Sequence, residues 1–350
     1  MQTEENVSPA RNGTNKRLGI KQIAAEAGVS IATVSRVING RETVDPRLRK
    51  QVLEAIDRLD YRPNGIARSL RLRRTATLGA VIPSIMNPYF TEVVRAMQDT
   101  ATTYGYTLLV TNSDRDVKKE EATLATFLDR QIDGVVLVSA ATGSEPSAAL
   151  RALLDHGTPI VALDRALTYL DLDQVTVDTR SGARAAVAHL VARGRRQIAF
   201  IAGPPSIFTA SEKLAGYRDG LAEAGLPGDD ALVFPGDYTI ESGEAQALAL
   251  LALRPRPDAL LVANNLMTLG AIRVLLRQQV AIPREIAVVG YDDVPWTDVV
   301  RPTVTVVSQP THELGKRAIE LLVARLTGDG PPTARANEVL PTTLIVREST

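Results

Sequence analysis

The sequence predicts two architectures in one chain: an N-terminal all-α helix-turn-helix headpiece and a larger α/β core of two doubly wound lobes. Residues 18–62 repeat apolar positions at helical spacing, with a glycine break between two short helices. From about Thr77 onward, short apolar runs alternate with amphipathic segments, which is typical of a parallel sheet with helical crossovers. The chain has 350 residues, of which 45% are hydrophobic, and this is enough for a large core.

The helix pair lies in IKQIAAEAGVSIATVSRVING. The first helix carries apolar residues on one face and ends at Gly28, and Ser30 is positioned to cap the second helix. The small or branched residues turned inward are Ala24, Ala27, Val29 and Val34. Ile31, Ala32, Thr33, Ser35 and Arg36 are left facing outward, where they can enter a major groove of DNA.

A third helix and a basic segment follow. Asp45 is the expected N-cap and Pro46 the first helical residue. The residues expected on the inner face of this helix are Leu48, Val52, Ala55, Ile56 and Leu59. The segment YRPNGIARSLRLRRT then places apolar side chains among arginines, which suits a minor groove.

These residues resemble the headpiece and hinge of the lactose/galactose repressor (LacI/GalR) family of bacterial transcription regulators, through AGVSIATVSRVING and YRPNGIARSL. The resemblance implies a DNA-binding set of Ser30, Ile31, Ala32, Thr33, Ser35, Arg36, Asn39, Tyr61, Asn64, Ala67, Leu70 and Arg71. In it, Ile31, Ala32 and Arg36 read bases, and Leu70 is the hinge residue that two subunits insert at the centre of the operator, the DNA site. Ile31 and Ala32 depart from members with polar residues there, so Arg36 is expected to carry most direct reading.

Charge divides the chain in the same way. Residues 1–75 hold 15 Lys and Arg against 8 Asp and Glu, whereas the remainder holds 25 against 32, and the whole chain is neutral. A basic headpiece fits DNA binding that weakens with salt, although a solvated structural face can also be basic.

In the core, the runs expected as strands are LGAVIP, TLLVTN, GVVLVSA, PIVALD, IAFIAG, ALVFPGD, ALLVANN and IAVVGYDD. Helices are expected near 88–104, 116–131, 145–156, 180–193, 209–225, 240–253 and 265–280. Ligands of doubly wound sheets bind beyond the carboxyl ends of the strands. The candidate effector-binding residues near those ends are Asn87, Tyr89, Phe90, Asp114, Asp164, Thr209, Lys213, Tyr238, Asn264 and Asp292. Any single Asp or Asn among them is as readily a helix or turn cap.

The core is similar to the periplasmic-binding-protein-like core of the same family, through IAFIAGPP, KLAGYRDGL, ALLVANNLMTLGAI and VVGYDD. The domain boundaries expected are a disordered arm at 1–17, the headpiece at 18–62, a hinge helix and linker at 63–75, and the core at 76–350. Within the core, lobe 1 is expected at about 76–176 and 308–338, and lobe 2 at about 177–307 and 339–350. The resemblance places an effector in the cleft between them, with Phe90 and Tyr238 as stacking walls.

The sequence leaves three classes of effector possible. Lys213 stands where most members have an arginine, and a lysine lacks the planar fork of donors. Carboxylates at Asp164 and Asp292 with aromatic walls favour a sugar or sugar-derived polyol, ahead of a sugar acid or phosphate, and then a purine.

Two rival classes are an α/β enzyme and a solute-binding protein, each with an incidental helical N-terminal domain. The sequence has no G-x-G-x-x-G, G-x-x-x-x-G-K-[ST], G-x-S-x-G or H-E-x-x-H motif, and no cysteine. We therefore expect no catalytic residues, no metal and no cofactor. No apolar run is long enough for a membrane span and no signal peptide is recognised, so we expect a cytoplasmic protein without a membrane partner.

The resulting hypothesis is a transcriptional regulator, a repressor by default, whose operator affinity is switched by a small-molecule effector. Its expected partners are a near-palindromic double-stranded DNA operator and a second copy of the chain. A homodimer is expected because no heptad extension follows LPTTLIVREST.

Overall fold

The computed structural model describes residues 19–38, 44–60, 74–141, 143, 145–328 and 334–350. The chain divides into two compact units, Met1–Arg73 and Arg74–Thr350. Among the described residues, no helix is long and apolar enough to cross a membrane.

The smaller unit contains the predicted helix pair and third helix, α1 (Ile20–Ala27), α2 (Ile31–Ile38) and α3 (Pro46–Arg58). Gly28 has a φ of 64°, and this left-handed conformation turns the chain after α1 at no steric cost to a glycine. The Ser30 hydroxyl accepts a hydrogen bond from the Thr33 amide at 3.1 Å. Oδ1 of Asp45 accepts one from the Arg47 amide at 2.8 Å, which confirms both predicted N-caps.

The core of this unit is a small apolar cluster with Ile23, Val34 and Val52 at its centre, all inaccessible to solvent. Leu48 was expected on the inner face of α3, but this expectation is wrong, because 38% of its surface is exposed. Leu48 faces the same side of α3 as the buried Val52 and Ala55. It lies in the first turn, at the end of the helix, and is not part of the apolar cluster.

The larger unit contains two six-stranded sheets. The first has the order β11-β5-β4-β3-β1-β2 and is parallel throughout. Its strands are β1 (Thr77–Ile82), β2 (Thr107–Asn112), β3 (Gly134–Leu137), β4 (Ile160–Leu163), β5 (Asp173–Val177) and β11 (Asn337–Leu340).

The second sheet has the order β12-β10-β9-β8-β6-β7 and is parallel except for the β10–β12 pair. Its strands are β6 (Ile198–Ala202), β7 (Val233–Pro235), β8 (Ala259–Val262), β9 (Ala287–Tyr291), β10 (Thr305–Ser308) and β12 (Thr343–Ile345). The doubly wound architecture predicted for both lobes is therefore present.

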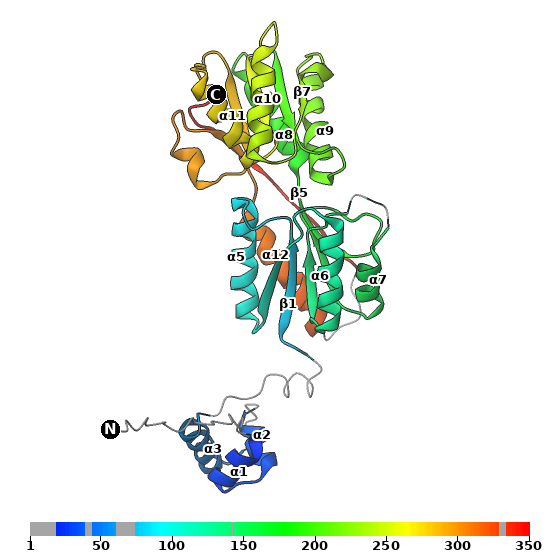
Figure 1. Ribbon diagram of the computed structural model, residues 1–350, viewed down its shortest axis with the longest axis vertical. Coiled ribbons are helices and arrows are strands. Elements are labelled where there is room, and N and C mark those ends of the chain that lie inside the picture. The colour runs from blue at the N-terminus through cyan, green and yellow to red at the C-terminus, as the bar shows by residue number, and fades with distance from the viewer. Residues whose placement is uncertain (1–18, 39–43, 61–73, 142, 144, 329–333) are drawn as a thin grey trace, which may run out of the picture. The chain divides into compact units, whose positions relative to one another are not determined.

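Helices cover both faces of each sheet (Figure 1). In lobe 1, α5 (Pro88–Thr103) and α12 (Thr311–Thr327) pack on one face, and α6 (Val117–Asp129) and α7 (Ala148–Asp155) on the other. Successive β1 residues follow this division, since Ala80 and Ile82 join the α5 cluster and Val81 joins the α6 cluster. In lobe 2, α8 (Thr179–Ala192) packs on α9 (Phe208–Glu223), and α10 (Ile240–Ala252) on α11 (Asn265–Arg277). Two 3₁₀ helices are Asp230–Leu232 and Pro295–Asp298.

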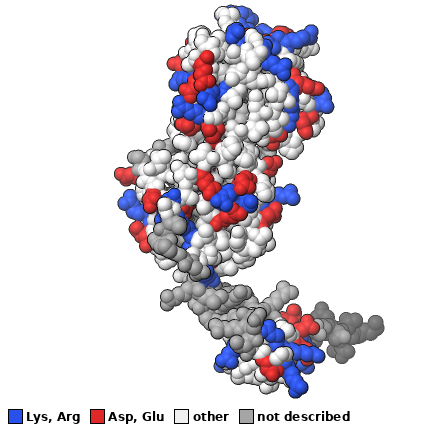
Figure 2. All heavy atoms as spheres, turned by 180° about the vertical axis from the view of Figure 1, so that it is seen from behind, with Lys and Arg blue, Asp and Glu red and all other residues white. Residues whose placement is uncertain are grey.

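The chain passes between the lobes after Val177, after Ser308 and after Leu340. These passages join consecutive elements that belong to different sheets, and after Ser308 the chain forms α12 and β11 of lobe 1. On the face of the core drawn in Figure 2, basic and acidic side chains alternate rather than gather by sign.

Candidate functional site

A cavity of about 400 Å³ lies between the two lobes and is lined by residues of both. Nine of the ten candidate effector residues line it: Asn87, Tyr89, Phe90, Asp164, Thr209, Lys213, Tyr238, Asn264 and Asp292. They come from the segments after the carboxyl ends of strands and from the first two turns of the following helices, as the topology requires.

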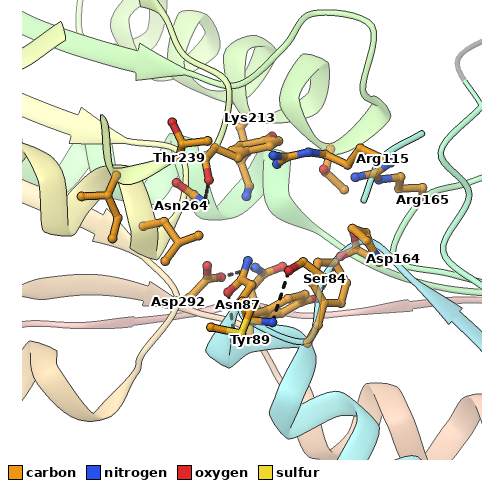
Figure 3. Close-up of a pocket in the computed structure, with 18 of the residues that line it drawn as sticks. Ser84, Asn87, Tyr89, Arg115, Asp164, Arg165, Lys213, Thr239, Asn264 and Asp292 are labelled. Carbon is orange, nitrogen blue, oxygen red and sulfur yellow. Dashed lines mark hydrogen bonds between the residues drawn. The ribbon is translucent and has the colours of Figure 1, made fainter. Parts of the chain in front are cut away.

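The lobe 1 wall is built on the start of α5 (Figure 3). Oδ1 of Asn87 caps this helix by accepting from the Tyr89 amide at 3.1 Å. The Tyr89 hydroxyl donates to Oδ1 of Asp164 at 2.8 Å, and its ring meets Phe90 edge to face at 4.9 Å. Burial raises the pKa of Asp164, which the neighbouring Arg165 opposes, and burial also raises the pKa of Tyr89. This wall therefore presents a carboxyl held in place by a phenol.

The lobe 2 wall holds a buried cation. Lys213, on α9, is 5% exposed. Its Nζ donates to the Ala263 carbonyl at 2.8 Å and lies 4.1 Å from the centroid of the Tyr291 ring. Burial lowers the pKa of Lys213, against the charges of Asp292 and Asp164.

Asp292 is the centre of a hydrogen-bond network. Its Oδ1 accepts from Nε2 of Gln309 at 2.6 Å. Its Oδ2 accepts from the amide and Nδ2 of Asn265, at 3.3 and 2.8 Å. The same Nδ2 donates to Oδ1 of Asn87 at 2.8 Å, across the cleft. Sequence reasoning missed Asn265 and Gln309, although Asn265 directly follows the candidate Asn264.

The rest of the lobe 2 wall depends on close packing. Asn264 caps α11 through the Met267 amide at 2.9 Å. Tyr238 lies against Gly203, where an added Cβ would come within 2.2 Å of the tyrosine ring, so this position requires glycine. Thr209 is buried in the first turn of α9.

The tenth candidate, Asp114, does not line the cavity. It is exposed and pairs with Nζ of Lys119 at 2.7 Å. The next residue, Arg115, lines the cavity instead, as does Arg165, which follows Asp164. Sequence reasoning missed both arginines, because it chose the acid that directly precedes each of them.

In the headpiece, α2 exposes one face. Ile31 is 45% exposed, and Ala32 and Arg36 are also exposed. Thr33 and Ser35 are partly exposed, whereas Val34 and Val37 are buried. The predicted base-reading side chains therefore lie away from the core of this unit. The candidates Asn39, Tyr61, Asn64, Ala67, Leu70 and Arg71 lie outside the described residues.

Two family descriptions match the chain. Residues 19–64 match the family described as bacterial regulatory proteins, lacI family. Residues 187–350 match a periplasmic binding protein-like domain.

Three relatives extend the likeness over most of the chain. Catabolite control protein A of Priestia megaterium is 36% identical over 87% of this chain and 91% of its own length. The ribose operon repressor of Halalkalibacterium halodurans is 32% identical over 95% and 96%. The transcriptional regulator CelR of Thermobifida fusca is 36% identical over 95% and 98%.

Two solved structures are similar in fold. A CelR–cellobiose complex superposes with a TM-score of 0.72 at 35% identity, over 95% of this chain and 100% of the other. A lac repressor dimer bound to operator and the anti-inducer ONPF superposes with a TM-score of 0.84 at 27% identity, over 95% and 99%.

Proposed function

The chain belongs to the lacI family of bacterial regulatory proteins, and we propose that it is a repressor whose operator affinity is set by a sugar or sugar derivative bound between the two lobes. One observation carries this proposal. The same chain holds a helix-turn-helix unit with an exposed recognition face and a two-lobed unit with a polar, aromatic-lined cavity.

On the DNA side, α2 would enter the major groove, with Arg36 donating to a guanine edge and Ile31 and Ala32 contacting thymine methyl groups. Their exposure on a helix that is anchored by Val34 and Val37 supports these roles. Leu70 would act as a wedge in the minor groove at the operator centre, the role that the family pattern gives to this position.

On the effector side, the cavity combines hydrogen-bonding carboxyls with aromatic walls, which suits hydroxyl groups and the apolar face of a sugar ring. Relatives support the same class: one is called a ribose operon repressor, and the solved CelR complex contains cellobiose. We infer that Asp164, Lys213 and Asp292 hold the effector between the lobes.

The assembly we propose is a homodimer on a near-palindromic operator. The similar lac repressor structure is described as a dimer bound to operator. An effector that favours one lobe arrangement would change operator affinity by a coupling of about 1 to 3 kcal/mol. Because its partner is chromosomal DNA, the protein would act in the cytoplasm. The family consists of regulators, and we propose no catalytic role for the cavity.

The test is a selection of random duplex DNA by the purified full-length protein, with and without a panel of sugars, sugar acids, sugar phosphates and purines. Enrichment of a near-palindrome that one compound weakens or strengthens is the expected result. A failure to enrich any sequence under every condition would reject the proposal.

A further inference from the structure

Two arginines lie together at one end of the cleft. Arg115 follows β2 in a turn where its own φ is 61°, and Arg165 follows β4. Figure 3 shows both side chains at the same end of the cavity. Burial lowers the pKa of Arg165, and repulsion by Arg115 lowers it further. Like charges placed this close in a cleft are costly unless an anion lies between them.

Arg165 is only partly satisfied by the protein. It is 8% exposed, and its Nη1 donates to the Ser139 carbonyl at 2.7 Å. Its Nε is buried and has no hydrogen-bond partner among the described residues. A buried guanidinium nitrogen without an acceptor costs free energy, so this Nε can gain a hydrogen bond from a ligand that brings an acceptor.

The acids of the cleft are already engaged. Asp164 accepts from the Tyr89 hydroxyl, and both oxygens of Asp292 accept from amides of Gln309 and Asn265. Glu241, the remaining acid of the lining, is exposed in the first turn of α10.

The buried cations already face acids of the protein. Lys213 faces Asp292 and Asp164, and Arg165 faces Asp164 and the buried Glu120, which itself accepts from the Ser139 hydroxyl and the Ala140 amide. Arg115 adds a positive charge and makes no ion pair or hydrogen bond with a described residue. The nearby acid Asp237 is already engaged: against the effect of burial, hydrogen bonds from Thr239 to its Oδ1 lower its pKa, and the charge of Arg115 contributes less.

We propose that the effector carries an anionic group, a carboxylate or a phosphate, which Arg115 and Arg165 bind at this end of the cleft. The planar guanidinium offers two parallel donors, which match both anions, and the pair supplies the fork of donors that Lys213 lacks. This proposal deepens the proposed function and rests on it. It places a sugar acid or sugar phosphate ahead of the neutral sugar.

The test is a calorimetric titration of the full-length protein with matched compounds. Glucose, galactose and ribose are each compared with their aldonates and terminal phosphates, and cellobiose with cellobionate. At least one acid is expected to bind about tenfold or more tightly than its neutral parent. The aldonate and phosphate arms tell the two anions apart.

Variants locate the anion. Arg115→Gln is expected to weaken the acid about tenfold while leaving the neutral parent unchanged, and Arg115→Lys to weaken it less. Arg151→Gln removes an equal charge from the exposed face of α7 and serves as the matched control. Because Arg115 is exposed, its replacement should not disturb folding, which circular dichroism checks.

Three outcomes would overturn the proposal: a neutral sugar that binds as tightly as its acids, acid binding that Arg115→Gln leaves unchanged, or no binding by any acid in the panel. Operator affinity measured on the same preparations separates the two proposals. A neutral sugar that changes operator affinity leaves the proposed function intact and rejects only the anionic effector.

Discussion

Nδ2 of Asn265 lies 2.8 Å from Oδ1 of Asn87, and this hydrogen bond joins lobe 2 to lobe 1 across the cleft. Asn265 is fully buried and also donates to Asp292, while Asn87 caps α5. The contact therefore connects the start of one helix in each lobe to the carboxylate at the centre of the site. A ligand that binds Asp292 therefore acts on a residue that is hydrogen-bonded to the contact between the lobes.

Breaking this bond should weaken effector binding. Asn87→Ser keeps a side chain that can cap α5, but the shorter serine does not reach Asn265. The lobe arrangement that the effector needs would lose about 0.5 to 1.5 kcal/mol, or about two- to tenfold in effector affinity. Titration calorimetry measures the effect. Equal effector affinities for Asn87→Ser and the wild type would contradict this reading.

Removing the Asp292 carboxylate should abolish the effector response and also destabilise the core. In Asp292→Ala, the amides of Gln309 and Asn265 lose their buried acceptor, at a cost of about 1 to 3 kcal/mol. Operator binding without effector should remain. Fluorescence anisotropy on operator DNA and urea unfolding measure the two effects, and a variant that still responds normally to effector would remove Asp292 from the site.

The mainly apolar strands and the amphipathic helices of both lobes could be predicted from the sequence, whereas β5 and β11 could not. Their segments, DQVTV and NEVL, mix polar with apolar residues. Their conformation depends on partners distant in sequence, such as the Ala336 carbonyl that accepts from the Gln174 amide. Local sequence patterns do not indicate such long-range strand pairing.

The sequence indicated which residue types lie near the cavity, but not which side chains point into it. Asp114, Arg115, Asp164, Tyr238 and Asp292 all have positive φ, between 51° and 69°. Residues other than glycine rarely adopt this conformation, so a pattern of residue types does not reveal which side chain it turns into the cleft. This is why Asp114 was chosen in place of Arg115. The packing of the surrounding loops decides which way these side chains point, and this packing is seen only in the structure.

Arg36 should carry the base discrimination of the headpiece. Arg36→Ala is expected to weaken operator binding by about 1 to 3 kcal/mol and to relax the preference at one base pair of each half-site. Lys50→Ala, at an exposed position of α3, removes an equal charge and is the control. Competition between operators with single base changes measures the preference. An unchanged preference at every position would assign base reading to other residues.

The Leu70 prediction separates the two functions of the chain. Leu70→Ala should weaken operator binding, because the smaller side chain cannot hold base pairs apart at the operator centre. Effector affinity of the free protein should stay near that of the wild type. Anisotropy with operator DNA and calorimetry with effector measure the two quantities, and a simultaneous loss of both would contradict a modular arrangement.

Acid should remove a stabilising contact at Asp173, a buried residue of β5. Burial alone would raise the pKa of Asp173, but hydrogen bonds from Arg325 at 2.7 and 2.8 Å and from the Ala336 amide at 2.9 Å hold it below its ordinary value. A folded-state pKa below the unfolded value means that the ionised carboxylate stabilises the fold. This stabilisation is complete above the unfolded pKa of about 3.9 and is lost as the pH falls through the folded value.

The prediction is tested with Asp173→Asn, which cannot ionise. The free energy of unfolding of the wild type should exceed that of the variant by a constant amount above about pH 5, and this difference should shrink below about pH 4. Urea unfolding followed by the fluorescence of Trp296, the single tryptophan, measures it. Asp171→Asn is the control, because the Asp171 side chain is 86% exposed and its replacement should have little effect at any pH. A difference between wild type and Asp173→Asn that stays constant from pH 7 to pH 3 would mean that the Arg325 contact does not depend on the charge of Asp173.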